Sequence, residues 1–545
     1  MNRKGINYTL VFLLCLPLLF INIKHSHDWG DDFAQYLHQT KNICQGTPQL
    51  QSGYIYNPEF ILGPPAYPSG FPMLLAPVYS TWGLSFVHFD LYMSLYLLAL
   101  ALLLFAFLNR YFSSLISILA VLLFVYNPWT LNFKMEIMSD LPFAVLLISC
   151  FLIYERSEKK GVLYFLSLAL LSGILVCVRN AGFAFLVAIL MDAGIKTVRK
   201  LLPVKQLVLT FLIFVLSFLI YLTINNWLFP TVDKGLFSYH FTYPGAQQKH
   251  YVLENIHYNM AVFRAFFEPS NNQWGFVSII CGSLVFTFTV LGFIKRIAER
   301  FGFIELTVLL YFSVVAVYPI SNAGFRFILP VAPFLLYYAI TGLYCIHIPL
   351  GPVLKPACLP FLLFALIFFS YSNGLSEAVL NRNKELNGPQ EKESVEAFNY
   401  IIEHTPDSSR FNFIKPRALS LYTGRRAMSH RPLQNLSEIQ NSFTKNQIEY
   451  ILVNDEISDD SLKYFVKSRS SELDLIWSNP KFKLYKRTFF YIPSTIEGIR
   501  KLENDIVNTH DWRELVRKKA MERKMPVDSM IYMDAKYLYD SKKGL

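Results

Sequence analysis

The residues best suited to chemistry lie in one short segment that follows the first apolar stretch of the chain. The sequence His25-Ser26-His27-Asp28-Trp29-Gly30-Asp31-Asp32 places three carboxylates within five residues. Phe33, Tyr36 and Leu37 follow at helical spacing, so a short helix in the membrane interface is expected to begin near Asp32. Two interpretations stay open. An aspartate caps this helix in a solvated acidic turn, or a carboxylate is held at the membrane surface as a general base or as a ligand of a divalent cation.

A second set of acidic residues brackets the predicted loop 129–138. Glu136 lies within this loop and Asp140 lies at the start of the next apolar stretch. Together with Asp31 and Asp32 they can form a cation site or orient an acceptor. Capping of the following helix by Asp140 is the simpler account.

The elements that must position these residues are apolar helices. The 545 residues are 53% hydrophobic and 16% charged, with a mean hydropathy of +0.34, which excludes a soluble enzyme. Residues 1–371 contain 22 Lys+Arg and 15 Asp+Glu, whereas the shorter segment 372–545 contains 28 and 24. Lipid is therefore the expected solvent of the first segment and water that of the second. Eleven membrane spans are predicted, at 7–23, 91–108, 112–128, 139–154, 161–178, 181–195, 206–225, 276–294, 303–319, 327–346 and 357–371.

Basic residues orient these predicted spans. If the N-terminus is cytoplasmic, 14 of the 22 Lys+Arg of residues 1–371 lie in the inside turns, which is the positive-inside pattern. The loops 24–90, 129–138 and 226–275 then lie on the external face together with the C-terminal part. Long loops commonly carry function, so the active face is expected to be external.

Charge and cysteine usage argue against several classes of protein. The net charge of +11 divides into +7 for residues 1–371 and +4 for residues 372–545, and the basic residues of the first part lie in short loops between apolar stretches, so nucleic acid is not an expected partner. The seven cysteines form neither a disulfide framework nor a CxxC metal site. No internal repeat is visible and ionisable residues are scarce at mid-helix, which argues against a transporter or a proton pump.

The polar C-terminal part alternates between helical and strand patterns. Residues 372–490 are predicted to form a small external α/β domain, with a helix that ends before Pro406. Strands are expected at 411–414, 448–453, 473–477 and 482–485. Residues 491–545 form a polar tail, in which helices are expected at 495–506, 508–522 and 527–540. Trp512, Leu515 and Val516 are expected to dock this tail onto the domain.

Several short segments occur in a recognisable order along residues 1–490. They are Asp32-Phe33-Ala34-Gln35-Tyr36, Tyr67-Pro68-Ser69-Gly70-Phe71-Pro72-Met73-Leu74-Leu75-Ala76-Pro77, Met138-Ser139-Asp140-Leu141-Pro142-Phe143, Arg179-Asn180-Ala181-Gly182 and Gly324-Phe325-Arg326-Phe327-Ile328-Leu329-Pro330-Val331-Ala332-Pro333. In this order they resemble the GT-C glycosyltransferase superfamily, specifically the bacterial relatives of protein mannosyltransferases and lipid A aminoarabinose transferases. The resemblance implies a polytopic α-helical membrane protein of GT-C-like fold with about eleven transmembrane helices. Residues 1–371 would be its catalytic region, followed by the small external α/β domain.

The resemblance also implies a reaction. It is the inverting transfer of a sugar from a polyprenyl-phosphate-linked donor to a lipid, glycan or protein acceptor, at the external face of a bacterial inner membrane. An acidic residue of the first loop would act as the general base. Alignment on Tyr36 selects Asp32 for this role and is favoured, whereas alignment on the acidic pair selects Asp31.

The leaving group of such a reaction is a lipid phosphate, which needs a cation to stabilise it. Arg326 and Arg179 are the main candidates, because arginine binds phosphate oxygens bidentately. The alternatives are interfacial snorkelling for Arg326 and neutralisation of a carboxylate for Arg179. Further candidates are Lys134, Lys234, Lys249 and Arg264. The pattern identifies no particular cofactor, and a divalent cation at the acidic residues stays open.

Other functions also stay open. A lipid-linked glycan polymerase or ligase uses polyprenyl-linked donors at the same face and differs mainly in the pyrophosphate and the size of the donor. A flippase for such a lipid is expected to need a hydrophilic path through the spans, which the sequence lacks. A noncatalytic assembly protein would not need clustered acidic residues in the first loop.

Overall fold

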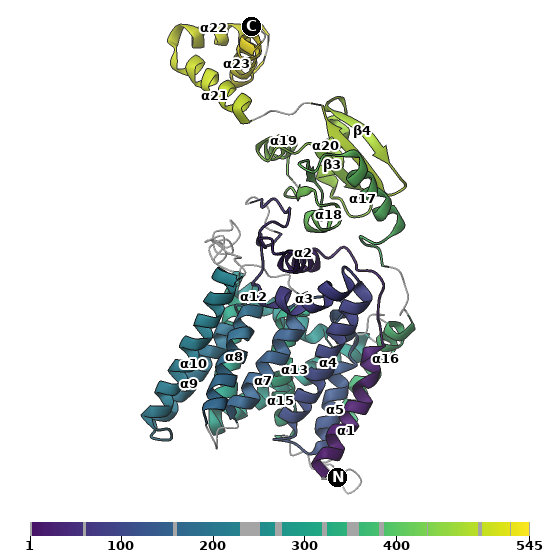
Figure 1. The fold of residues 1–545 in the computed structure, drawn as a ribbon, viewed down its shortest axis with the longest axis vertical. Coiled ribbons are helices and arrows are strands. Elements are labelled where there is room, and N and C mark those ends of the chain that lie inside the picture. Colours follow the sequence, from purple (N-terminus) through teal and green to yellow (C-terminus); the bar gives the residue numbers. More distant parts are fainter. Residues whose placement is uncertain are drawn as a thin grey trace. The chain divides into compact units, whose positions relative to one another are not determined.

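The computed structural model of the chain forms two compact units (Figure 1). Unit 1 comprises Met1–Ser52 and Gly63–Glu391, and unit 2 comprises Gly53–Leu62 and Lys392–Leu545. The residues described are 3–57, 62–155, 161–228, 251–266, 275–318, 324–345, 359–380, 386–432, 434–488, 493–523 and 525–543.

The described part of unit 1 is helical. Most of its helices run alongside one another, and α2 and α3 lie at the end of the bundle opposite the N-terminus (Figure 1). The α-helices are α1 (Arg3–Cys15), α2 (Asp32–Gln45), α3 (Gly70–Trp82), α4 (Phe86–Leu108), α5 (Ser114–Val125), α6 (Pro128–Phe133), α7 (Asp140–Glu155), α8 (Val162–Val178), α9 (Gly182–Val198), α10 (Val204–Leu222), α12 (Tyr251–Ala265), α13 (Gly275–Arg300), α14 (Phe303–Val317), α15 (Ala332–Leu343) and α16 (Leu359–Leu380). Short 3₁₀ helices occur at Leu16–Leu19, Gly324–Phe327 and Leu329–Val331, and a π-helix at Thr223–Leu228.

Each of the eleven apolar stretches predicted from the sequence contains a helix. Helical segments long and apolar enough to cross a membrane are Phe86–Leu108, Val204–Asn226, Ile279–Arg300, Gly324–Leu343 and Pro360–Leu380. Shorter apolar helices are Gly5–Leu19, Ser114–Val125, Val162–Val178 and Phe303–Val317. The predicted class of a polytopic helical membrane protein is therefore confirmed, whereas the count of eleven spans is not.

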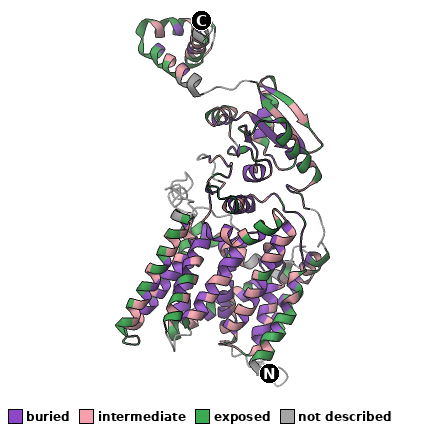
Figure 2. Ribbon diagram, in the orientation of Figure 1, coloured by how far each residue is buried: buried purple, intermediate pink, exposed green. Residues whose placement is uncertain are grey.

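The burial pattern of unit 1 fits helices solvated by lipid. In the apolar window of α4, 56% of the residues are buried inside the protein, but in that of α10 only 17% are. Val208, Phe211 and Leu219 of α10 are exposed, and Figure 2 shows exposed residues along this helix. Large apolar side chains that point outward along a whole helix are stable where the solvent is hydrocarbon.

Helices α13 and α15 approach each other at the level of the backbone. A Cβ atom added to Gly292 would lie 1.9 Å from the carbonyl oxygen of Tyr338, and one added to Gly342 would lie 1.9 Å from that of Phe288. Glycines at such a crossing allow two membrane helices to pack closely. This contact fixes α15, the helix that follows the 3₁₀ turns near Arg326.

Unit 2 contains a mixed five-stranded sheet with the strand order β2-β1-β3-β5-β4. The strands are β1 (Arg410–Asn412), β2 (Arg426–Met428), β3 (Tyr450–Asn454), β4 (Leu473–Ser478) and β5 (Phe482–Arg487). β1 pairs in parallel with β2 and β3, whereas β5 pairs antiparallel with β3 and β4. The four predicted strands are present. β2 was not predicted, because three residues of sequence Arg-Ala-Met show no β-branched or alternating pattern.

Four helices pack with this sheet. They are α17 (Lys392–His404), α18 (Pro416–Thr423), α19 (Leu436–Lys445) and α20 (Asp460–Ser468). Met428 of β2, Ile439 and Phe443 of α19, Ile451 of β3 and Phe465 of α20 share one buried cluster. The predicted helix that ends before Pro406 corresponds to α17.

A segment of the first long loop forms part of unit 2. Tyr54 pairs in parallel with Ala427 of β2. The amide of Ile55 donates to the carbonyl of Ala427 at 2.7 Å, and the amide of Ala427 donates to the carbonyl of Gly53 at 2.9 Å. The buried Tyr54 ring lies 4.9 Å from the guanidinium carbon of Arg417. The segment therefore covers the edge of β2, which would otherwise expose unpaired backbone groups.

The C-terminal tail is a three-helix bundle. Its helices are α21 (Pro493–Asn508), α22 (His510–Glu522) and α23 (Val527–Lys543). Its buried cluster consists of Ile499, Ile506, Val516, Ala520, Met530 and Ala535, with Trp512 packed against it. Leu515 is 52% exposed. Trp512 and Val516, which were predicted to dock the tail onto the α/β domain, therefore serve the core of the tail itself.

The α13–α15 crossing predicts that Gly292→Ala destabilises the protein. The new methyl group would overlap the backbone of α15, at a cost of about 1–3 kcal/mol. Gly194→Ala in α9 is the matched control, since no atom lies within 4 Å of its added Cβ and alanine is the better helix former. The melting temperature of the detergent-purified protein is expected to fall for Gly292→Ala only. Equal melting temperatures for the two variants would contradict the close crossing.

Candidate functional site

Four charged side chains from separate parts of unit 1 meet near the start of α2. Asp32 and Asp140 are the first residues of α2 and α7, Arg179 lies between α8 and α9, and Arg326 lies in the 3₁₀ turn Gly324–Phe327. Arg326 is ion-paired with Asp32, and Arg179 with Asp140. The Nε atom of Arg326 also lies 3.5 Å from Oδ2 of Asp140. We refer to these four residues as the charge quartet.

The charge quartet has a buried half and a more exposed half. The side chain of Asp140 is 0% exposed and that of Arg179 is 14% exposed, whereas Asp32 and Arg326 are 18% and 21% exposed. Two carboxylates and two guanidinium groups cancel in formal charge. Charges this deeply buried are stable only when they are paired, so each member holds the others in place.

Tyr67 forms a hydrogen bond with the carboxylate oxygen of Asp32 that Arg326 does not bind. Its hydroxyl donates to Asp32 Oδ1 at 2.5 Å, while Arg326 pairs with Oδ2. The Tyr67 ring stacks on Tyr36 with a centroid distance of 4.5 Å, and the Tyr36 hydroxyl lies 3.2 Å from Oγ of Ser139. Both carboxylate oxygens of Asp32 are therefore engaged, one by a hydroxyl and one by a cation.

Buried glutamines of α2 position Tyr67. Gln39 accepts from the Tyr67 amide at 2.8 Å and donates to the Tyr67 carbonyl at 2.9 Å. Gln35 donates to the carbonyl of Pro65 at 2.8 Å, and Gln39 donates to Oε1 of Gln49 at 2.8 Å. Because Asp32 begins the same helix, α2 fixes both partners of the bond between Tyr67 and Asp32.

A second group of titratable side chains consists of His27, Asp28 and Glu136. One potential ligand atom from each lies within 4.8 Å of the others. His27 is 3% exposed and stacks on Phe33 at 3.7 Å, whereas the side chain of Asp28 is 52% exposed. Burial raises the pKa of Glu136 to about 7, and the charge of Asp28 adds to this rise. Burial lowers the pKa of His27, but the hydrogen bond and charge of Asp28 outweigh it and raise the pKa above its ordinary value.

The loop that carries this second group is anchored to the segment just before α17. The Trp29 indole donates to Asn387 Oδ1 at 2.9 Å, and the His27 amide donates to Gln390 Oε1 at 2.9 Å. A Cβ atom added to Gly388 would lie 1.9 Å from the His27 carbonyl oxygen. The residues before Asp32 are thus held by specific contacts.

Two buried charged residues, Lys134 and Asp90, bind the segment of chain that leads into this loop. Lys134 is 0% exposed, and its ammonium donates to Ser94 Oγ at 2.7 Å and to the carbonyl of Leu18 at 2.9 Å. Buried Asp90 accepts from the amide of Lys24 at 3.0 Å. Lys134, a predicted phosphate ligand, is therefore a buried group that links the 3₁₀ helix Leu16–Leu19 to α4.

The structure brings together only some of the predicted site residues. Asp32, Asp140, Arg179 and Arg326 form the charge quartet, whereas Glu136 lies with His27 and Asp28. Asp31 occupies the N-cap position of α2 and makes no side-chain capping bond there.

Some predictions fall on parts of the chain that the structure does not describe. Lys234, Lys249, the side chain of Arg264 and most of the loop 226–275 lie outside the described residues. The sequence analysis missed the roles of Tyr67 and His27. The available signal was their position, since Tyr67 begins one of the family-like segments and His27 adjoins the acidic cluster.

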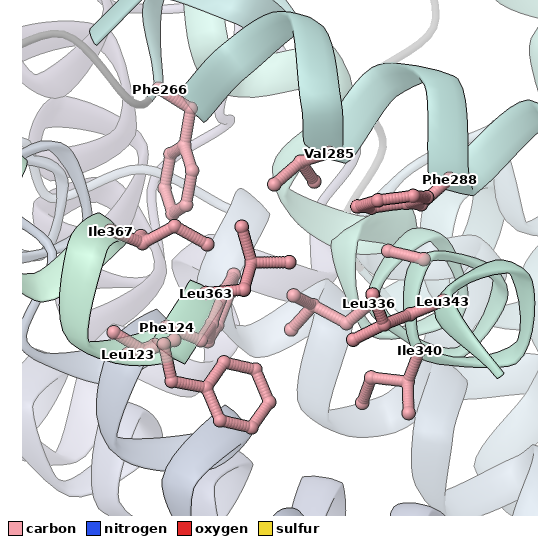
Figure 3. A pocket seen from close by; sticks show the side chains of 12 residues that line it. Leu123, Phe124, Phe266, Val285, Phe288, Leu336, Ile340, Leu343, Leu363 and Ile367 are labelled. Carbon is pink, nitrogen blue, oxygen red and sulfur yellow. The ribbon is translucent and has the colours of Figure 1, made fainter. Parts of the chain in front are cut away.

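Apolar cavities lie among the helices of unit 1. One of 30 Å³ is enclosed by α5, α13, α15 and α16, and Figure 3 shows Phe124, Val285, Leu336 and Leu363 pointing into it. It has room for about one water molecule and is a packing defect.

A larger cavity of 260 Å³ lies between α12, α13 and α14. It is lined by Asn255, Ile256, Asn259, Met260, Phe263, Phe286, Thr289, Phe312, Val315, Ala316, Ile328 and Leu335. Most of these side chains are apolar. One lining residue, Ile328, lies two residues after Arg326 along the chain.

Comparison with known proteins identifies the fold. Residues 67–473 match a family described as predicted membrane protein (DUF2079). No curated protein is significantly similar to the chain. ArnT from Cupriavidus metallidurans, solved with bound undecaprenyl phosphate, is similar in structure with a TM-score of 0.54 and 12% identity, over 89% of this chain and 98% of its own.

Archaeal oligosaccharyltransferases show the same likeness. AglB from Archaeoglobus fulgidus, in complex with an inhibitory peptide and a dolichol-phosphate, has a TM-score of 0.54 and 12% identity, over 89% of this chain and 74% of its own. An Archaeoglobus fulgidus oligosaccharyltransferase in complex with Zn and sulfate has a TM-score of 0.50 and 12% identity, over 82% and 68%. At these identities the likeness concerns the fold alone. The predicted GT-C-like fold is confirmed.

The glutamine network predicts that Gln39→Leu loosens the segment 62–69. The change removes three hydrogen bonds, including both that hold the Tyr67 backbone. Hydrogen–deuterium exchange of this segment is expected to rise several-fold, measured by mass spectrometry on the purified protein. Gln45→Leu is the control because Gln45 is exposed at the end of α2. Unchanged exchange in Gln39→Leu would show that other contacts position Tyr67.

Proposed function

The chain belongs to the DUF2079 family of predicted membrane proteins, and from this membership, its GT-C fold and its charge quartet we propose that it is a membrane glycosyltransferase. It transfers a sugar from a polyprenyl-phosphate-linked donor to a lipid, glycan or protein acceptor. The observation that carries the proposal is Asp32, a partly exposed carboxylate held between the Tyr67 hydroxyl and the Arg326 guanidinium. A base for the acceptor and a cation for the departing phosphate are thereby adjacent.

In the proposed reaction the acceptor hydroxyl gives its proton to the Asp32 carboxylate while its oxygen bonds to the anomeric carbon of the sugar. The bond between that carbon and the phosphate oxygen breaks, and its electron pair stays on the oxygen. Attack opposite the phosphate inverts the anomeric configuration. Arg326 stabilises the leaving phosphate, while Arg179 neutralises the buried Asp140. Asp31 is the second candidate for the base.

Two features support a lipid-linked donor. The 260 Å³ cavity is lined mainly by apolar side chains, as a site for an apolar lipid chain would be, and one of them, Ile328, lies two residues after Arg326 along the chain. In addition, the structurally similar ArnT and AglB were solved with undecaprenyl phosphate and a dolichol-phosphate, respectively.

A second candidate function is that of a glycan ligase or polymerase. It is favoured by the likeness to AglB, which is an oligosaccharyltransferase. The same base and cation would serve such a reaction, but the donor would carry a whole glycan on a pyrophosphate. The donor that accumulates in a strain lacking activity separates these functions from each other and from a flippase.

His27, Asp28 and Glu136 suit a divalent cation. One imidazole and two carboxylates are ligands that Zn²⁺ and Mn²⁺ accept, and their ligand atoms converge within 4.8 Å. A cation there would supply positive charge beside the acidic first loop. This set shares only Glu136 with the predicted cation site of Asp31, Asp32, Glu136 and Asp140.

We assign the site to the external face of a bacterial inner membrane, with the N-terminus in the cytoplasm. The positive-inside pattern of the short turns supports this orientation. The start of α2 and the N-terminus also lie at opposite ends of the helical bundle (Figure 1).

Asp32→Asn is expected to abolish transfer while leaving membrane insertion normal, because it removes the base and keeps the shape of the side chain. A loss of about 10²–10⁴-fold corresponds to the contribution of a general base. The measurement is mass spectrometry of lipid-linked sugars and surface glycans in a deletion strain of the source organism. This strain is complemented with the wild type, Asp32→Asn, Asp31→Asn, or the control Asp474→Asn, which changes an exposed aspartate of β4.

Loss of one sugar together with accumulation of a polyprenyl monophosphate sugar would support the transferase. Accumulation of pyrophosphate-linked oligosaccharides would favour the ligase or polymerase. If Asp31→Asn is inactive and Asp32→Asn is active, the base is Asp31. Unchanged glycans in the deletion strain would contradict the proposed function.

The cation site predicts that the purified protein binds Mn²⁺ or Zn²⁺ and that Glu136→Gln and His27→Ala each weaken binding at least tenfold. Isothermal titration calorimetry of the metal alone measures this effect. His510→Ala is the matched control because His510 is exposed in the tail. Equal affinity in all variants would place any bound cation elsewhere.

A further inference from the structure

Arg326 is shared between two carboxylates of the charge quartet. It is ion-paired with Asp32, and its Nε atom lies 3.5 Å from Oδ2 of Asp140. The Tyr67 hydroxyl holds the other oxygen of Asp32 at 2.5 Å. A carboxylate that is paired with a guanidinium and accepts a hydrogen bond is a weak proton acceptor. With these contacts in place, the base assigned to the reaction is restrained before any substrate arrives.

Of the two arginines, Arg326 is the one that can leave its partner. The side chain of Asp140 is 0% exposed, so removing Arg179 would leave a fully buried carboxylate without its closest cation. Asp32 is 18% exposed and keeps its bond from Tyr67 when Arg326 moves away. Arg326 is also the most exposed member of the quartet, at 21%.

The charge balance of the quartet favours movement of Arg326 toward a bound phosphate. The formal charges of the quartet cancel, so a lipid phosphodiester entering the site adds a negative charge without a matching cation. A guanidinium binds phosphate oxygens bidentately, and Arg326 is the more exposed of the two arginines in the quartet. Binding the phosphate through Arg326 costs its partly exposed ion pair with Asp32 and its longer 3.5 Å contact with Asp140, but Asp140 keeps its ion pair with Arg179.

We propose that Arg326 exchanges its partner when the donor binds, leaving Asp32 for the phosphate and so releasing the base. The inference rests on the proposed function and adds an order to it. The donor binds first, and only then is Asp32 able to accept the proton of an acceptor hydroxyl. After transfer, the lipid phosphate retains Arg326 until it leaves, Asp32 gives the proton that it accepted to water, and the ion pair between Asp32 and Arg326 then forms again.

A double-mutant cycle on the binding of undecaprenyl phosphate tests the exchange. The full-length protein in nanodiscs is titrated as wild type, Asp32→Asn, Arg326→Gln and the double variant, with binding followed by microscale thermophoresis. Arg326→Gln is expected to weaken binding at least tenfold. Asp32→Asn is expected to tighten binding several-fold because it frees Arg326, and this gain is expected to vanish when Arg326 is absent.

Asp31→Asn is the matched control, since it removes the same charge one residue away. Equal tightening by Asp31→Asn, or tightening by Asp32→Asn that persists without Arg326, would indicate simple charge repulsion and overturn the exchange. Weaker or unchanged binding by Asp32→Asn would overturn it as well. If any of these results is found while the wild type binds the lipid phosphate and Arg326→Gln weakens that binding, the exchange is overturned but the proposed function stands. If no variant binds the lipid phosphate, both proposals fail.

The melting temperature of each variant is measured to check that the variant is folded. Arg326→Lys is included in case Arg326→Gln does not fold, because lysine retains the positive charge but loses the bidentate geometry of arginine. Binding by Arg326→Lys is expected to lie between that of the wild type and Arg326→Gln. Binding equal to the wild type in Arg326→Lys would contradict bidentate capture of the phosphate by Arg326.

Discussion

The ion pair between Asp32 and Arg326 joins residues that are 294 positions apart, and the ends of several helices depend on it. Asp32 begins α2, Arg326 precedes α15, and Asp140 brings the start of α7 to the same point. Each of these groups would be costly to bury alone near a membrane. Their mutual neutralisation therefore determines where these helices begin relative to one another.

Much of the helical unit could be predicted from hydropathy, because spans solvated by lipid must be apolar for most of their length. The quartet residues were also recognisable, since charged residues at the ends of apolar stretches are few. Their pairing was not predictable. Glu136 and Asp140 are close in sequence, yet Glu136 joins His27 while Asp140 binds Arg179. Tertiary packing determines which charged residues pair, and neither their spacing in the sequence nor their secondary-structure propensity predicts that pairing.

The first long loop combines two properties that a sequence does not reveal together. It is polar and irregular for much of its length, and it is nevertheless fixed by buried side-chain bonds. Gln39 holds the Tyr67 backbone, while Asn387 and Gln390 hold Trp29 and His27. Satisfied polar networks of this kind hold a backbone in one conformation. The charge quartet is consequently built on a preformed loop, which would lower the entropic cost of binding the proposed lipid donor.

The segment 53–57, which covers the edge of β2, can join the sheet only late in the synthesis of the chain. Asn57 donates to the carbonyl of Ser429 across 372 positions, and Ile55 pairs with Ala427 beside it. When the ribosome has made this segment, the strand that it will cover does not yet exist. It must wait while the helices of unit 1 are inserted, and it can join the sheet only after β2 emerges. Such distant pairing forms slowly, so closure of this sheet edge is a late step in the maturation of the chain.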